Sequence, residues 1–183
     1  MYAVGYLIRF KRFHSLQTGC TRLATRPCEH HNASMAYEWK HQRRVEFSET
    51  DMAGIVHFAN FFRYMESAEH AFMRSLGHSV TLSDIDAALG LPRVHAHCDY
   101  RRPLYFENEY EVHLLVESIQ KKAIIYQFRI YLLTKNFPGN EIARGGITIV
   151  CARKDESGNL AASMLPEILR SKIQKAPDDL LNQ

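Results

Sequence analysis

The clearest hydrophobic pattern in the chain lies between residues 58 and 76. Large apolar side chains recur there at three- and four-residue spacing, at Phe58, Phe62, Met65, Phe72 and Leu76, with Phe61 and Ala68 beside them. Charged and polar side chains fall mostly elsewhere on the same stretch, at Arg63, Glu66, Glu69, His70 and Arg74. This period predicts a helix of about 28 Å with one broad buried face. Gly77 is a natural stop, and Asn60 is a candidate cap of the first turn.

Alternating patterns on both sides of this helix predict strands. They cover residues 37–47, 93–102, 109–119, 123–133 and 141–153, with a bend at 103–108 and a hairpin connection at 138–140. Residues 78–92 are irregular, with a short helical turn over 82–89, and residues 164–173 suit a short terminal helix. Consecutive strands with short connections indicate an antiparallel sheet. One long apolar helix beside one sheet packs most simply if the sheet curls around it, so we expect an α+β fold of that kind.

Composition supports a single ordinary domain. The chain has 183 residues, of which 46% are hydrophobic, and a net charge of +3, which excludes a disordered chain. No apolar run reaches the ~20 residues that a membrane-spanning helix needs. The basic charge is concentrated in residues 1–35, which hold five basic groups and one acid, whereas the remainder holds 18 and 19. The main domain is therefore near neutral, and a nucleic-acid partner is not expected.

Residues 1–34 form an extension before the domain at 35–183. They are poor in acids, carry several arginines and show no sustained period, which is typical of an organellar transit peptide. A secretory signal fits poorly, because no basic residue precedes the short apolar stretch at residues 4–8. A disordered tail, or an upstream start codon before Met35, is the alternative. We expect a cytoplasmic protein, or an organellar one if the extension is a transit peptide.

The cysteines do not suggest a metal site or disulfides. Cys20, Cys28, His30 and His31 match no zinc-ligand spacing, so no metal and no cofactor is expected. Cys98 and Cys151 lie far apart in strand-like runs and are interpreted as small apolar residues in a reducing compartment.

The stretch before the helix carries the candidate chemistry. Asp51 and Gly54 lie in a turn-rich loop, and Phe58 stands at the predicted helix start. A helix N-terminus has unpaired N–H groups and a partial positive charge, which suit a developing oxyanion. A carboxylate beside it can attack a carbonyl carbon or activate a water. The simpler interpretation is an Asx turn from Asp51 to Ala53 that only shapes the loop.

The residues from Asp51 to Glu66 also carry a resemblance. Asp51-Met52-Ala53-Gly54-Ile55-Val56-His57-Phe58-Ala59-Asn60-Phe61, followed by Arg63-Tyr64-Met65-Glu66, resembles the signature of the 4-hydroxybenzoyl-CoA thioesterase family. It is similar to the bacterial branch that includes the thioesterase linked to the Tol–Pal system. The stretch Asp99-Tyr100-Arg101-Arg102-Pro103-Leu104 resembles a strand and bend of the same family. The resemblance covers about residues 37–165 and implies the hotdog fold.

The resemblance also implies roles for these residues. Asp51 would be the catalytic carboxylate, as nucleophile or general base, and the backbone N–H of Phe58 would polarise the thioester carbonyl, with Gly54 shaping the loop. Phe58 departs from the family in lacking a hydroxyl, which matters little if the backbone acts. His57 replaces a frequent aromatic residue, and either packs as a neutral ring near the pocket mouth or serves as a general acid.

Three charged residues are candidates for substrate binding. Arg101 and Arg102 could hold the phosphates of coenzyme A, although strand alternation allows at most one of them to do so, and ordinary surface charge is the alternative. Glu66 faces either the active site or an interface, and an ion pair at the surface or subunit boundary is the simpler interpretation.

Three functions remain for this sequence. The first is hydrolysis of an acyl-CoA thioester to acid and CoA. The second is hydration or dehydration of an acyl thioester, which in other hotdog enzymes needs a His–acid pair at a spacing not found after His57. The third is a silent acyl-CoA-binding module. The many apolar strand residues, together with the resemblance, predict a homodimer or a tetramer made of dimers, with the active site at the dimer boundary.

Overall fold

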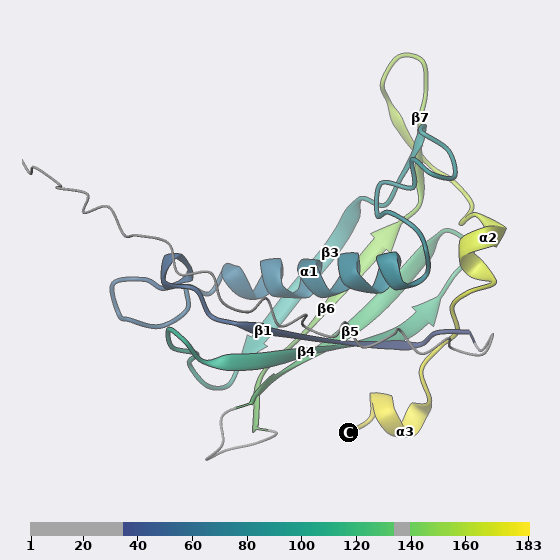
Figure 1. The fold of residues 1–183 in the computed structure, drawn as a ribbon. Helices are drawn as coiled ribbons and strands as arrows, with labels where there is room; N and C mark the ends of the chain where they lie inside the picture. The colour runs from purple at the N-terminus through teal and green to yellow at the C-terminus, as the bar shows by residue number, and fades with distance from the viewer. Residues whose placement is uncertain (1–34, 134–139) are drawn as a thin grey trace, which may run out of the picture. The chain divides into compact units, whose positions relative to one another are not determined.

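The computed structural model describes residues 35–133 and 140–183. Five strands form its main sheet: β1 (Glu38–Arg44), β3 (Arg93–Tyr100), β4 (Glu109–Ile119), β5 (Ala123–Leu132) and β6 (Asn140–Val150). All pairs are antiparallel, in the order β1-β4-β5-β6-β3 (Figure 1). The expectations for residues 1–34, including their cysteines and histidines, and for most of the hairpin connection lie outside the described residues.

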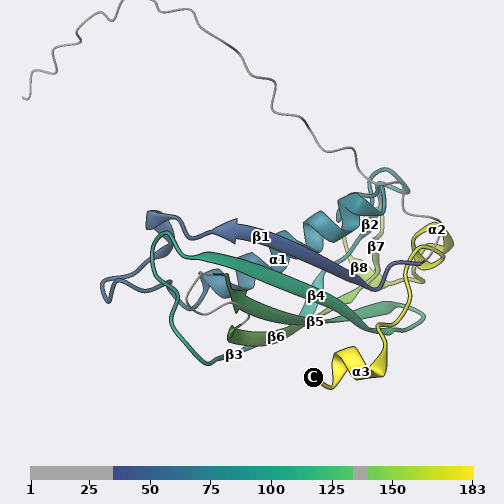
Figure 2. The ribbon, with the colours of Figure 1, turned by 60° about the horizontal axis from the view of Figure 1, so that its bottom comes forward.

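The long helix α1 (Asn60–Ser75) lies along one face of this sheet, and the strands curve beneath it (Figures 1 and 2). The core forms between them from the inward side chains of α1, β4, β5 and β6. At Gly145 of β6 both α1 and the neighbouring strand β3 come very close. A Cβ atom there would lie 2.8 Å from Met65 Sδ of the helix and 2.5 Å from the carbonyl oxygen of His97 in β3. The expected α+β arrangement of one helix wrapped by an antiparallel sheet is confirmed.

The helix differs in detail from the prediction. It begins at Asn60 rather than 58, and Phe58 precedes it with 61% of its surface exposed. The expected cap is wrong, because Ala59 occupies the N-cap and the Asn60 side chain bonds elsewhere. Glu69, which we expected on the polar side, is fully buried. Because the sheet curls around α1, the buried arc is wider than the apolar stripe and takes in this acid.

Other predicted boundaries also shift. The strand expected over 141–153 divides at Cys151: β6 stays in the main sheet, and β7 (Ala152–Lys154) joins β2 (Leu89–Gly90) and β8 (Leu160–Ala162) in a separate three-stranded sheet. No helix forms over residues 82–89; the chain makes successive turns there and enters β2 at Leu89. The terminal helix shrinks to one turn, α2 (Glu167–Arg170), and α3 (Asp178–Leu181) follows it. Phe47–Glu49 forms a single 3-10 turn, η1.

Two contacts anchor the C-terminal segment to the domain. Lys172 Nζ donates to the carbonyl of Leu76 at the end of α1, at 2.8 Å. Arg129 of β5 donates to the carbonyls of Leu180 and Leu181 in α3 at 2.6 and 3.0 Å. Cys98 and Cys151 are free thiols, half-buried and buried. Within the described ranges, no helix is both long and apolar enough to cross a membrane.

Candidate active site

The loop before α1 is a tight turn around Asp51. The backbone N–H of Asp51 donates to the carbonyl of Ile55, and that of Gly54 to the carbonyl of Asp51, both at 2.9 Å. Asp51 Oδ1 accepts from Ala53 N–H at 2.8 Å, which is the expected Asx turn. Gly54 has φ +74°, a conformation that other residues rarely adopt. The Asp51 side chain is exposed, and its Oδ2 meets no donor in the described part of the chain.

Glu49 connects this loop to the start of the helix. Its carbonyl oxygen accepts two hydrogen bonds, from His57 N–H at 2.9 Å and from Asn60 Nδ2 at 2.7 Å. Its carboxylate accepts from the hydroxyl of Tyr64 at 3.0 Å. Burial, and then the nearby Tyr110 and Glu49, raise the pKa of Tyr64, so this phenol stays a donor. Sequence reasoning missed Glu49, because its partners follow 8 to 15 residues later and no spacing rule joins them.

The bend after β3 holds the other side of the loop. Val56 N–H donates to the carbonyl of Leu104 at 2.8 Å. Tyr100 OH, at the end of β3, donates to the carbonyl of Phe58 at 3.2 Å, and its ring meets that of Phe61 edge-on at 5.1 Å. The backbone around Phe58 is therefore fixed from both sides. Its N–H, one residue before the N-cap of α1, donates to no acceptor among residues 35–133 and 140–183.

His57 packs locally. Its ring lies 4.5 Å from that of Phe58, and its Nδ1 accepts from Ala59 N–H at 3.3 Å, which ties the ring to the helix start. This is the packing arrangement that we gave as the alternative to a general acid. No acidic group contacts His57 in the region described, so the structure shows no His–acid pair there.

Exposed apolar side chains surround the loop. Phe58, Tyr100 and Tyr105 are each about half exposed or more, and Phe47 and Phe106 pack edge-on at 5.7 Å. Exposed aromatic rings beside an exposed carboxylate are typical of a surface that is covered by a ligand or by another chain.

Glu66 lies away from the loop, in a charged cluster on α1. Arg93 Nη2, at the start of β3, lies 3.1 Å from Glu66 and 2.6 Å from Glu69. Burial raises the pKa of Glu69, while Arg93 opposes that shift, and Glu69 Oε1 has no hydrogen-bond partner in the described structure. Within one copy of the chain, Glu66 thus makes the expected ion pair and is not brought to Asp51.

Arg101 and Arg102 do not occupy alternating strand positions. β3 ends at Tyr100, and the backbone N–H groups of Arg101 and Arg102 donate to the same carbonyl, that of Ile142, at 2.8 and 3.1 Å. Arg101 pairs with Glu141 at 2.8 Å, which also binds Arg144. Our alternation argument is therefore wrong, because the strand ends before Arg101.

The described residues contain no group of three or more potential metal ligands.

Comparison with known proteins identifies the family. Residues 45–183 match the model of the thioesterase-like superfamily. The chain belongs to this superfamily. It is 31% identical over 144 residues to the 1,4-dihydroxy-2-naphthoyl-CoA hydrolase of Synechococcus elongatus, an alignment that covers 77% of the chain and 98% of that protein. The sequence-based predictions of family and of thioester hydrolysis are confirmed.

Solved structures agree with this assignment. A gentisyl-coenzyme A thioesterase superimposes with a TM-score of 0.61 at 30% identity, over 72% of the chain and 98% of its own. The 4-hydroxybenzoyl CoA thioesterase from Pseudomonas sp. strain CBS-3 superimposes with a TM-score of 0.66 at 19% identity, over 74% and 99%. The thioesterase described here therefore has the hotdog fold that we expected.

Proposed function

We propose that this thioesterase hydrolyses an acyl-CoA with the Asp51 carboxylate and the Phe58 N–H as its working groups. The observation that carries the proposal is their placement: a carboxylate with one free oxygen and an unpaired N–H lie on one loop whose two ends are fixed by Glu49 and Leu104. The N–H donates a hydrogen bond to the thioester oxygen and so stabilises the negative charge that develops there. Gly54 holds the turn that presents the carboxylate.

Two reaction routes for thioester hydrolysis are open to these groups. In the first, Asp51 attacks the acyl carbon, the C–S bond breaks to release CoA thiolate, and water then hydrolyses the acyl–aspartyl anhydride. In the second, Asp51 takes a proton from a water that attacks the same carbon, and the thiolate leaves from the tetrahedral intermediate. Each gives a free acid and CoA without a metal or a cofactor.

Replacing Asp51 tests the proposal. Asp51→Asn keeps an acceptor for Ala53 N–H, so the loop should fold, but the amide is neither nucleophile nor base. We expect kcat to fall at least about 100-fold, measured as thiol release from acyl-CoA. Asp155→Asn is the matched control, because Asp155 also accepts a backbone N–H in a turn, on the distant β7–β8 hairpin. Near-normal turnover by Asp51→Asn would remove the carboxylate from the mechanism.

We propose an aromatic acyl group. Two relatives are named for aromatic acyl-CoA esters, and the exposed rings of Phe58, Tyr100 and Tyr105 lie beside the loop. Thiol release from 4-hydroxybenzoyl-CoA should exceed that from hexanoyl-CoA at equal concentration; the reverse order would favour an aliphatic substrate. An absorbance change of an enoyl-CoA without thiol release would indicate hydratase activity, and binding alone a silent module.

We further propose that the active form is a homodimer joined along β3. This strand is an edge of the main sheet, and every residue except the half-buried Cys98 is exposed. An exposed edge offers unpaired backbone groups to a second copy. The opposite edge, β1, carries Lys40, Arg43 and the Glu109-paired Arg44 against one acid, Glu38, and lysine and excess like charge on an edge strand oppose pairing.

A further inference from the structure

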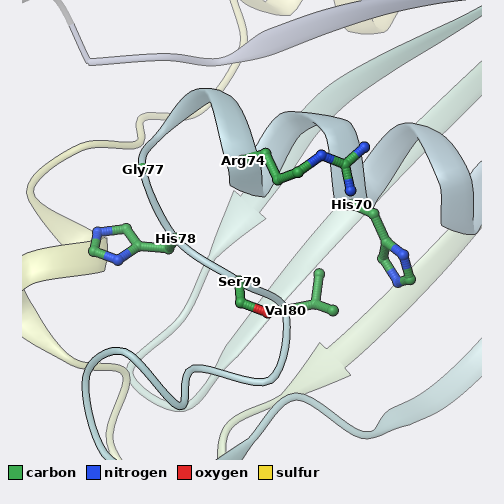
Figure 3. A pocket seen from close by; sticks show the side chains of 6 residues that line it. All are labelled: His70, Arg74, Gly77, His78, Ser79 and Val80. Carbon is green, nitrogen blue, oxygen red and sulfur yellow. The ribbon is translucent and has the colours of Figure 1, made fainter.

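A pocket lies at the far end of α1 from the Asp51 loop. It has a volume of about 590 Å³, and Figure 3 shows it between His70 and Arg74 of the helix and the following segment that carries Ser79 and Val80. His78 points away from it in the same view, toward the C-terminal segment, where its Nε2 meets Lys172 Nζ at 2.9 Å. Besides His78, the polar side chains that line the pocket are those of His70, Arg74 and Ser79.

Among the charged groups that line this pocket, Arg74 lacks a carboxylate partner in the region that the structure describes. The nearby carboxylates of Glu66 and Glu69 are engaged by Arg93, and Asp84 is engaged by His78 at 2.7 Å. The exposed guanidinium of Arg74 forms no ion pair or hydrogen bond within the described ranges. Burial, with Arg93 and Arg74 nearby, lowers the pKa of His70 against the opposing effect of Glu66. A guanidinium with an imidazole and a hydroxyl suits a phosphate group, which accepts several hydrogen bonds at once.

Pairing along β3 determines which active site this pocket adjoins. In one copy, Arg74 lies 16 residues after Phe58, which corresponds to about 24 Å along the axis of a helix. The Tyr100 end of β3 contacts Phe58, whereas the Arg93 end contacts Glu66 and Glu69. A two-fold antiparallel pairing places the Arg93 end of one copy beside the Tyr100 end of the other. The middle and C-terminal half of one α1 then approach the catalytic loop of the second copy.

We propose that the pocket of His70, Arg74 and Ser79 binds the phosphate-bearing nucleotide part of coenzyme A, whose thioester lies at Asp51 and Phe58 of the second copy. The inference rests on the proposed function and on the β3 dimer. It assigns phosphate recognition to Arg74, in place of the ion-paired Arg101.

The first test separates the nucleotide from the thioester. Arg74→Ala should raise KM for acyl-CoA about tenfold and leave kcat unchanged, because the phosphates lose the same binding energy in the ground state and in the transition state. The same acyl group on pantetheine, which lacks the nucleotide, should show no change in KM. Arg170→Ala is the control, since Arg170 is an exposed arginine at the end of α2. An unchanged KM for acyl-CoA, or equal changes for both esters, would overturn the proposal.

The second test asks whether the pocket acts across the boundary. Asp51→Asn and Arg74→Ala chains, co-expressed with different tags and purified as the mixed dimer, should regain low-KM turnover, because one of the two sites then combines native Asp51 with native Arg74 of the other chain. Turnover that stays at the high KM of Arg74→Ala would assign the pocket to its own copy and overturn the proposal. If neither ester releases thiol with the native protein, the proposed function itself fails, whatever Arg74 does.

Discussion

At the scale of single residues, the Asx turn of Asp51 is compatible with the catalytic role that we propose, although we first treated the two as alternatives. One oxygen shapes the Asx turn with Ala53 N–H, and the other stays free. The carboxylate is therefore oriented by the turn that it forms. This arrangement relies on Gly54, three residues after Asp51, whose φ of +74° closes the turn.

Replacing Gly54 tests how far the turn controls the chemistry. Nothing lies within 4 Å of a Cβ atom at this position, so the cost of Gly54→Ala comes from the backbone alone, about 1–2 kcal/mol. We expect kcat to fall about 10- to 100-fold as the carboxylate shifts, with a small loss of stability in denaturant unfolding. Gly90→Ala is the matched control, because its Cβ position is equally open and its φ is ordinary. Equal kcat in the two variants would contradict the expectation.

The sequence identified the local part of this site and missed the long-range part. Asp51, Gly54 and Phe58 became candidates because neighbouring residues encode a loop and a helix start, and the family resemblance supplied the roles that we propose for them. Tyr100 donates to Phe58 across 42 positions, and no pattern in the sequence indicates that contact. The arginines after it were placed incorrectly because the bend at Tyr100 ends the alternation on which our argument depended.

At the scale of elements, the fit of α1 into the sheet depends on residues without large side chains. Gly145 lets Met65 approach β6, where any larger residue would meet both the sulfur and the backbone of β3. We expect Gly145→Ala to lower the free energy of unfolding by about 1–3 kcal/mol, as overpacking does in tightly packed cores. Denaturant unfolding measures this loss. Gly90→Ala is again the control, because Gly158 has a positive φ and would add backbone strain of its own. Equal free energies of unfolding for Gly145→Ala and Gly90→Ala would contradict the close packing.

Periodicity predicted the existence of α1 and of the five long strands but not their ends. The strand-like run continues through Cys151 although the chain there leaves one sheet for another, and Cys151 and Ala152 are both buried, so the sequence pattern does not mark the change. The pairing of β7 with β2 joins residues more than 60 positions apart. Glu69 likewise enters the core only because Arg93, from a distant strand, supplies its counter-charge.

At the scale of the whole molecule, the two edges of the main sheet differ in how well they could pair. Apolar strands predicted self-association, but only the strand order shows that β3 is an edge. Ala96→Glu tests this edge. Near a two-fold axis the new carboxylates would face each other, so we expect monomers in sedimentation velocity and a loss of turnover. Lys40→Glu on β1 should remain a dimer. A dimer that persists with Ala96→Glu would place the interface elsewhere.

The carbonyl of Glu49, which receives both the His57 N–H and the Asn60 side chain, has a consequence for substrate encounter. Together with the bond from Val56 to Leu104, it orders the loop as the chain folds rather than when a ligand arrives. Conformational entropy is thus lost once, during folding, and not again at each binding event. If the thioester binds here as we propose, such preorganisation favours rapid capture and release with little rearrangement of the main chain.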